Sequence, residues 1–276
     1  MDFRDDVNLD PSQVEDRGGG GGGGRFPGGM VVGGGGIVSL IALVLVFVLN
    51  NVGGVDTEPG QGQPPANLAE ECRTGKDADQ AGKCQVVGVV NSIQDYWKTE
   101  LPEYRLAKTV LYSGGVRTAC GAADSSVGPF YCPGDQRVYL DLTFFDDLET
   151  RFGAKGGPFA QAYVIAHEYG HHVQNLLGAL DSGSSVAVEL QADCYAGVWA
   201  KKAYEGGFYA AEFTAAEIAE ALDAAAAVGD DRIQQRSGGR VDPESFTHGS
   251  SKQRTAAFQR GYDTGNPGRC EGAELM

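Results

Sequence analysis

The spacing of apolar and polar residues divides the chain into two parts. Residues 1–29 include seven consecutive glycines, at 18–24, and few apolar side chains. Such a segment cannot bury enough apolar surface to offset its ordering entropy, so we expect a disordered glycine-rich tail. From Leu68 onward apolar residues recur throughout, and residues 68–276 are long enough to bury a core. We therefore predict one folded domain there.

Within this domain the periodicity predicts a small sheet followed by helices. Residues 68–101 have apolar positions at helical spacing, whereas 108–112 and 136–140 have the composition of strands. Thr214, with Glu217 three residues later, forms a capping box for a helix that ends near residue 228. Further helices are predicted at 159–177, 184–204 and 250 to about 260. This order of elements predicts an α+β fold.

An uncharged stretch separates the tail from the domain. No charged residue lies between Arg25 and Asp56, and the dense apolar part, residues 37–49, is flanked by further uncharged residues. Together they reach the ~20 residues that cross a bilayer, so we predict a single transmembrane helix at 30–54. A cleaved signal peptide is the alternative, but the apolar core starts late and no A-x-A-like site follows it.

The distribution of basic residues predicts the orientation of this span. Arg4, Arg17 and Arg25 precede it, and no Lys or Arg follows before Arg73. The positive-inside rule then places the N-terminus in the cytoplasm and the domain outside it, so the protein is expected in the membrane. Residues 55–67, rich in Pro, Gly and Gln, are predicted to be a linker.

Charge and cysteine content narrow the choice of partners and compartment. The net charge of −15 makes a nucleic-acid partner unexpected, because phosphate binding needs a basic face. Six cysteines, all after the uncharged stretch, indicate disulfides in an oxidising compartment. Of the 15 pairings that six cysteines allow, the shortest loops favour two, which leaves a third: Cys72–Cys84, Cys120–Cys132 and Cys194–Cys270.

Three of the chain's four histidines lie within six residues, in the sequence HEYGHH. His167 and His171 are four apart, so on a helix both lie on one face and can bind one metal ion. Glu168 lies beside them, as the general base does in the H-E-x-x-H zinc motif. Buried histidines satisfied by backbone groups are the alternative. His172 points about 100° away around the helix, so we expect it to pack rather than to bind the metal.

A catalytic zinc ion needs a third protein ligand, and a second pair of polar residues can supply it. Glu189 and Asp193 are four apart in an otherwise apolar helix, 18 and 22 residues after His171. We predict that Glu189 is the third zinc ligand and that Asp193 accepts the outward N–H of a zinc-bound histidine. A surface carboxylate pair is the alternative. Because Leu177 stands where a metzincin would have its third histidine, the pattern favours the gluzincin type, as in thermolysin.

The fourth histidine follows later, in the sequence THGSSKQR. His248 could stabilise the negative charge that develops on a scissile carbonyl, and Arg254 could orient a carboxylate of the site. A surface-loop histidine with an arginine on the next helix is the alternative.

With these motifs the chain resembles the neutral zinc metallopeptidases of bacterial envelopes. The matching sequences are HEYGHHVQ, ELQADCYAGVWA, HGSSKQR and CGAADSSVGPFYCPGDQRVYLD, together with the uncharged segment after a glycine-rich tail. The resemblance implies a zincin-like domain with zinc held by His167, His171 and Glu189, and Glu168 as the catalytic base. More distantly, the chain is similar to membrane gluzincins with T-H-P-x-x-x-x-R, where Gly249 replaces the proline.

Taken together, these patterns predict a zinc-dependent peptidase that hydrolyses peptide or protein substrates by direct attack of water. The strand near 130–139 is expected to bind an extended peptide by edge pairing. Two alternatives share the same residues. One is a non-catalytic envelope scaffold stabilised by zinc, and the other is a zinc amidase that acts on cell-wall peptide.

Overall fold

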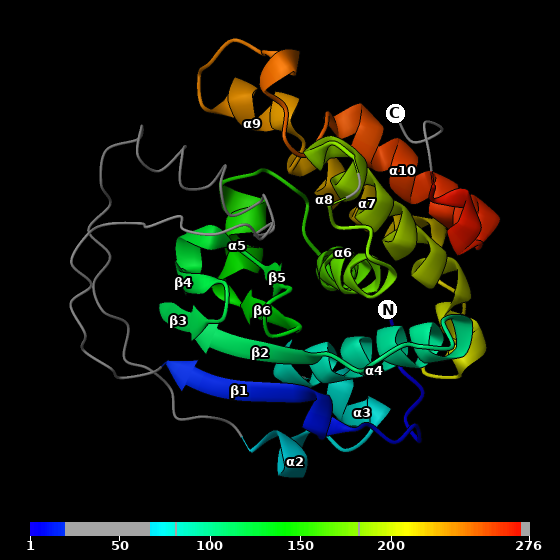
Figure 1. The fold of residues 1–276 in the computed structure, drawn as a ribbon. Coiled ribbons are helices and arrows are strands. Elements are labelled where there is room, and N and C mark those ends of the chain that lie inside the picture. Colours follow the sequence, from blue (N-terminus) through cyan, green and yellow to red (C-terminus); the bar gives the residue numbers. More distant parts are fainter. Residues whose placement is uncertain (20–66, 81, 182, 272–276) are drawn as a thin grey trace.

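The computed structural model describes residues 1–19, 67–80, 82–181 and 183–271. The predicted transmembrane helix at 30–54 and nearly all of the predicted linker lie outside these ranges, so both remain predictions. Within the described ranges, none of the helices has the length and the apolar character needed to cross a bilayer. The described part has the expected mixture of helices and a small sheet (Figure 1).

The main sheet has four strands in the order β1-β2-β6-β5. These strands are β1 (Val14–Gly19), β2 (Lys108–Ser113), β6 (Arg137–Asp141) and β5 (Phe130–Cys132). β1 and β6 run parallel to β2 on its two sides, and β5 pairs antiparallel with β6. The strands predicted at 108–112 and 136–140 are thus confirmed as the two central strands.

The first strand of this sheet corrects the prediction for the N-terminus. Residues 1–19 are ordered, with a short 3-10 helix at Pro11–Gln13 followed by β1. Phe3, Leu9 and Val14 are buried in the main core. The predicted disordered tail at 1–29 is therefore wrong for 1–19. Local composition misled the prediction, because three apolar side chains suffice when the rest of the domain supplies the surface they bury against.

A second, two-stranded sheet follows β2. It consists of β3 (Gly115–Thr118) and β4 (Gly121–Asp124), which pair antiparallel. Its turn is joined to the end of β5 by one disulfide. All three predicted disulfides are present: Cys72–Cys84, Cys120–Cys132 and Cys194–Cys270.

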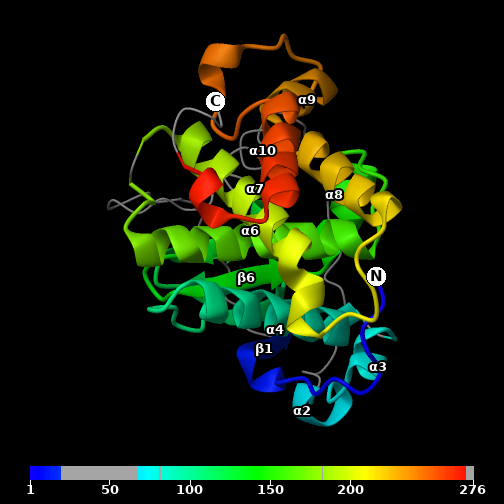
Figure 2. The ribbon, with the colours of Figure 1, turned by 90° about the vertical axis from the view of Figure 1, so that its right-hand side faces the viewer.

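One helix, α6 (Pro158–Leu177), lies in the middle of the fold. On one side it faces the sheet and α4 (Gly82–Glu100), and on the other it packs on α7 (Ser185–Lys202) and α8 (Ala215–Ala227), as Figures 1 and 2 show. α8 has the predicted capping box, in which Thr214 and Glu217 satisfy each other's backbone N–H groups. The remaining helices are α2 (Leu68–Glu71), α3 (Gly75–Ala78), α5 (Thr143–Thr150), α9 (Asp230–Arg236), α10 (Ser251–Thr264) and the 3-10 turns at Ser125–Val127, Ala203–Gly206, Pro243–Ser245 and Pro267–Arg269.

Two glycines allow α7 and α10 to cross in close contact. A Cβ atom on Gly197 of α7 would lie 2.0 Å from the carbonyl oxygen of Phe258 on α10. Likewise, a Cβ atom on Gly261 of α10 would lie 1.9 Å from the carbonyl oxygen of Cys194 on α7. Both distances are far below van der Waals contact, so only glycine fits at this crossing. The crossing fixes α10 against the helix that carries Glu189.

Candidate metal centre

Helix α6 presents His167 and His171 on one face, one turn apart. The helix starts with proline at its first turn and ends at Gly178, whose φ of 68° is the left-handed conformation typical of a helix C-terminus. Its middle is buried between the sheet and α7. Both imidazoles are almost fully buried, and their ring centroids lie 4.8 Å apart.

Helix α7 brings Glu189 to the same point. Its Oε2 lies 3.1 Å from Nε2 of His167, and its Oε1 lies 3.6 Å from Nε2 of His171. In the described part of the chain, these three residues form a group of donor atoms within 4.8 Å of one another that could hold a metal ion. The structure thus brings together the three residues that the sequence predicts as ligands.

Asp193, one turn further along α7, lies at the centre of a buried network. Its carboxylate accepts a hydrogen bond from Nδ1 of His167 at 2.8 Å and another from the Tyr163 hydroxyl at 2.6 Å. Arg254 on α10 donates to the same carboxylate through Nε at 2.8 Å and Nη2 at 2.9 Å. With the proton on Nδ1, His167 directs the lone pair of Nε2 toward Glu189 and His171. Arg254 therefore contacts a carboxylate of the site, that of Asp193, as the sequence suggested. Tyr163 is a further member of this network that the sequence did not reveal.

His171 is oriented by a neutral partner that sequence reasoning also missed. Its Nδ1 donates to Oε1 of Gln174 at 2.8 Å. The amide nitrogen of Gln174 donates to the carbonyl of Val188 at 2.7 Å, next to Glu189 in the chain. The signal was present in the sequence, because Gln174 follows His171 by three residues and so lies on the same face of the helix.

Glu168 is buried beside the ligands and is held by few polar contacts. The backbone N–H of Tyr131 on β5 faces this carboxylate, but among the described residues no hydrogen bond of normal geometry reaches either oxygen. Burial raises the pKa of Glu168 to about 7, although the positive charge on His167 opposes this rise. A carboxylate with a pKa near neutrality can both accept and release a proton.

His248 approaches from the loop before α10 and is fixed by Asp230. Nδ1 of His248 donates to Oδ1 of Asp230 at 3.0 Å. Oδ2 of Asp230 accepts the backbone N–H groups of Thr247, His248 and Gly249, at 2.8, 2.7 and 3.0 Å. Nε2 of His248 is buried and has no hydrogen-bond partner within the described ranges. Asp230 starts the short helix α9, and no sequence motif distinguishes it.

His172 lies outside the group of candidate ligand atoms. Its Nδ1 meets the hydroxyl of Tyr131 at 3.0 Å, and its Nε2 meets the carbonyl oxygen of Arg105 at 2.6 Å. Burial lowers the pKa of His172. Its contacts join α6 to β5 and to the segment before β2, which agrees with the expected packing role.

The charges at the site favour a bound cation. Burial by itself would lower the pKa of His167, but Asp193 and Glu189 outweigh it and raise the pKa to about 10. The pKa of His171, in contrast, falls to about 4 because of burial. In the absence of a metal, the two carboxylates therefore hold a proton on His167. A metal ion would supply the same positive charge.

Comparison with known proteins gives one family. The family model described as "Putative neutral zinc metallopeptidase" matches residues 1–273. A protein of Mycobacterium tuberculosis named "Uncharacterized protein Rv2575" is 52% identical over 216 residues, which cover 73% of this chain and 74% of the relative. "Uncharacterized protein YpfJ" of Escherichia coli is 43% identical over 250 residues, 84% of this chain and 85% of the relative. No solved structure matches the chain.

Proposed function

Because the chain belongs to the neutral zinc metallopeptidase family, we propose that it hydrolyses peptide bonds with a zinc ion held by His167, His171 and Glu189. The observation that carries the proposal is the geometry of these three side chains around one point, with the buried carboxylate of Glu168 beside them.

The donor atoms fit zinc. Ligand atoms about 2.0–2.2 Å from a tetrahedral zinc ion lie roughly 3.4 Å from one another. The contacts of Glu189 with His167 and His171, at 3.1 and 3.6 Å, bracket this value. Within the described ranges, these ligand atoms are buried and have no polar partner besides one another. Such a cluster is costly unless a proton or a metal ion binds it. Three protein ligands also leave one tetrahedral position for water, as catalytic sites require and structural sites do not.

Glu168 is proposed as the general base. Zinc, when bound, lowers the pKa of its water and polarises the scissile carbonyl. Glu168 accepts the proton of the attacking water and delivers it to the leaving amine, for which its raised pKa is suited. Burial keeps bulk water from competing for this proton.

His248 is proposed to stabilise the charge that develops on the substrate carbonyl oxygen. Because Asp230 occupies Nδ1, Nε2 is the atom left to face the substrate. The contacts of Asp230 with Nδ1 and with the loop backbone fix the direction in which Nε2 points.

Strand β5 is the proposed docking site for an extended peptide. It pairs with β6 on one side and is the last strand in the described sheet, so its other edge has no strand partner there. Tyr131 in the middle of β5 accepts a hydrogen bond from Asn175 of α6 at 2.8 Å and contacts His172, which holds the strand beside the metal-binding helix. A peptide paired with this edge would pass next to the site.

The proposal includes a location outside the cytoplasm. The domain contains three disulfides, two that close short loops and one, Cys194–Cys270, that joins residues 76 apart in the chain. Disulfides of this kind form and persist in oxidising compartments.

The test compares the full chain with Glu168→Gln, and with Glu149→Gln on the exposed side of α5 as the matched control. Zinc content should be equal in all three, while cleavage of a peptide mixture should fall at least about 100-fold only in Glu168→Gln. Equal cleavage by Glu168→Gln would contradict the assigned role. His171→Ala should lose both the bound zinc and the cleavage, which would link cleavage to the metal. The chain must start at residue 1, because a fragment that starts after the uncharged stretch lacks β1.

A further inference from the structure

We propose that residues 1–19 lie on the same side of the membrane as residues 67–271, as a strand and docked segment of the peptidase domain. This inference concerns the location of the chain's own N-terminus and is independent of the proposed catalysis.

Backbone hydrogen bonds join the N-terminal segment to the domain at three separate places. β1 pairs with β2 in register from Val14 opposite Thr109 to Asp16 opposite Leu111. Nearer the N-terminus, the backbone N–H of Leu9 donates to the carbonyl of Arg73 at 2.9 Å. Two further bonds, Arg4 N to Phe208 O at 2.9 Å and Ala210 N to Asp2 O at 3.0 Å, secure the start of the segment. A segment bound along its whole length is part of the fold rather than a tail.

The domain also has space shaped for this segment. The ring of Phe3 is buried against Tyr209, with ring centroids 4.8 Å apart. A Cβ atom on Gly88 of α4 would lie 2.7 Å from the Phe3 ring, and one on Gly75 of α3 would lie 2.1 Å from the carbonyl oxygen of Arg4. Larger residues at either glycine would exclude the segment, so the domain surface is complementary to residues 1–19.

Buried polar side chains of α4 find their partners in the N-terminal segment. The amide of Asn91 both accepts from the backbone N–H of Asp10 at 2.6 Å and donates to its carbonyl at 3.0 Å. Gln94 donates to the side chain of Gln13 at 2.7 Å. Leaving such groups buried and unpaired is costly, so they identify the segment as their intended partner.

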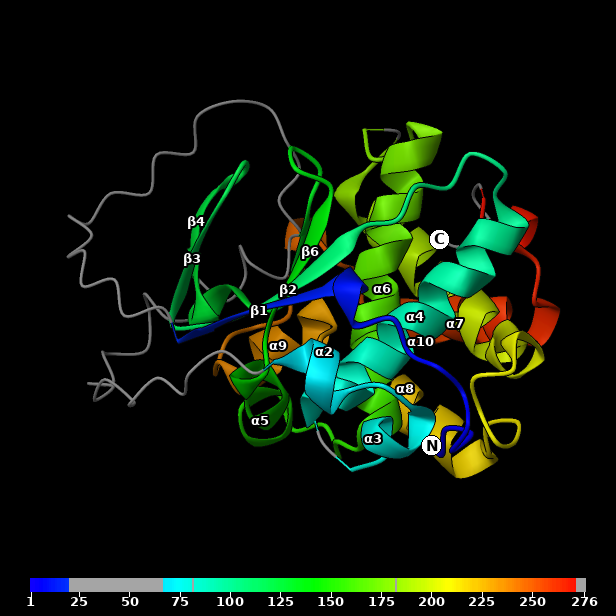
Figure 3. The same ribbon diagram turned by 90° about the horizontal axis from the view of Figure 1, so that it is seen from below.

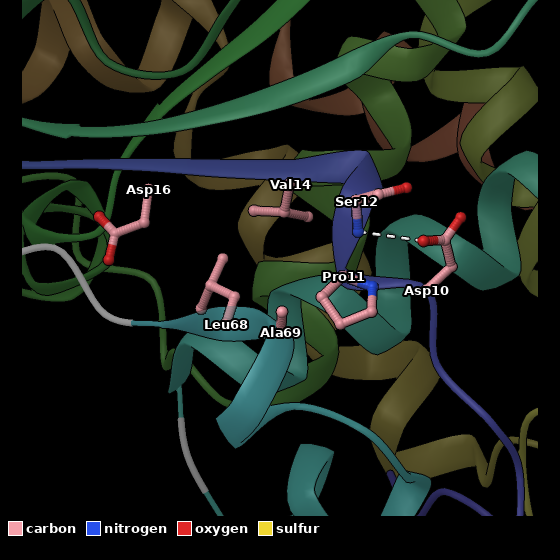
Figure 4. A pocket seen from close by; sticks show the side chains of 7 residues that line it. All are labelled: Asp10, Pro11, Ser12, Val14, Asp16, Leu68 and Ala69. Atoms are coloured by element: carbon pink, nitrogen blue, oxygen red, sulfur yellow. Dashed lines mark hydrogen bonds between the residues drawn. The ribbon is translucent and has the colours of Figure 1, made fainter.

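The point where the chain re-enters the domain is next to β1. Val14 of β1 and Leu68 at the start of α2 line one pocket together with Pro11 and Ala69 (Figure 4). Viewed from below, β1 lies beside β2 and close to α2 (Figure 3). Both ends of the undescribed stretch, Gly19 and Asn67, therefore belong to the same folded unit.

The pairing of β1 with β2 decides on which side of a membrane residues 1–19 can lie. The two strands share backbone hydrogen bonds, so both must lie on the same side of a bilayer. The three disulfides of the domain favour an oxidising compartment as that shared side.

The first experiment measures the side of each end in intact cells that express the full chain. Asp6→Cys and Glu70→Cys each add one exposed thiol, before and after the undescribed stretch. A membrane-impermeant maleimide should label both variants equally without lysis. Labelling of Glu70→Cys in intact cells, with Asp6→Cys labelled only after lysis, would overturn the proposal. Labelling of both only after lysis would support the shared side while refuting the extracytoplasmic location.

The second experiment tests the contact itself. Asn8 and Thr74 lie opposite each other in an isolated antiparallel bridge. Residues paired in this way have Cα atoms about 4.5–5.5 Å apart, which is within the range of a disulfide. The Asn8→Cys, Thr74→Cys double variant should form the cross-link during export, seen as one linked peptide in a nonreducing digest. The single variants serve as controls. Free thiols at both positions in the folded, exported protein would contradict docking.

Discussion

Replacing Asp193 with Asn gives the sharpest test of how the metal site is held together. The substitution keeps the size of the side chain but removes the charge that faces Arg254, and it gives His167 a weaker partner. Breaking a buried ion pair costs about 3–5 kcal/mol, because the remaining charge stays buried without compensation. Loss of the partner of a zinc-bound histidine weakens zinc binding about 10–100-fold, which is about 1.4–2.8 kcal/mol.

The two effects are measured separately. Urea unfolding of the metal-free protein measures the loss of stability. Competition with a coloured chelator measures the zinc affinity. Asp141→Asn is the matched control, because Asp141 is an equally buried carboxylate that accepts from Ser125 and Thr143 at the sheet, away from the histidines. It should lose stability while retaining the zinc affinity of the unaltered chain.

The reasoning would be refuted if Asp193→Asn lost several kcal/mol of stability but bound zinc within threefold of the unaltered chain. The hydrogen bond to His167 would then serve folding alone. An equal loss of zinc affinity in Asp141→Asn would likewise show that the effect follows general destabilisation.

Three further predictions follow from the packing and the charges. Phe3→Ala should lower the free energy of unfolding of the full chain by about 3–5 kcal/mol in urea titration, because it empties a fully enclosed position; no change would mean that the N-terminal segment is not docked. Gly197→Ala should lower the free energy of unfolding by about 1–3 kcal/mol in urea titration and raise the Kd for zinc, because the added methyl group meets the Phe258 carbonyl where α7 crosses α10; an unchanged free energy of unfolding would contradict the close crossing. Burial raises the pKa of Asp230, but the hydrogen bond and charge of His248 and the backbone amides outweigh it, so the pKa lies below its ordinary 3.8. The stability advantage of the unaltered chain over Asp230→Asn should therefore be full above pH 3.8 and shrink as the pH falls through the folded-state pKa; an advantage that grows toward acid would refute this sign.

The metal-binding pattern could be anticipated from local sequence because helix geometry is local. A spacing of four residues places His167 and His171 on one face of any helix, and the same rule aligns Glu189 with Asp193. That Glu189 meets the histidines could also be anticipated, since the short connection after α6 returns the chain along it. Gln174 could have been found by the same spacing rule.

Other parts of the site were decided only by tertiary packing. Asp230 starts an unremarkable short helix, and it becomes the partner of His248 only because the loop before α10 folds over it. Tyr163 likewise gains its role from meeting Asp193 and Arg254 in the core. Neither residue is distinguished by spacing from others of its type.

For the N-terminus, the sequence and the tertiary structure lead to different conclusions. The sequence by itself predicted the long helices, the two central strands and the histidine motif, because each follows from repeats or spacings within a short stretch. It only favoured two disulfide pairs by their short loops, and the third pair was what remained. Only the tertiary structure decided that residues 1–19 form a strand beside β2. Their few apolar side chains cannot fold alone, and they become ordered because α3, α4 and β2 already offer unpaired hydrogen-bonding groups and space for Phe3.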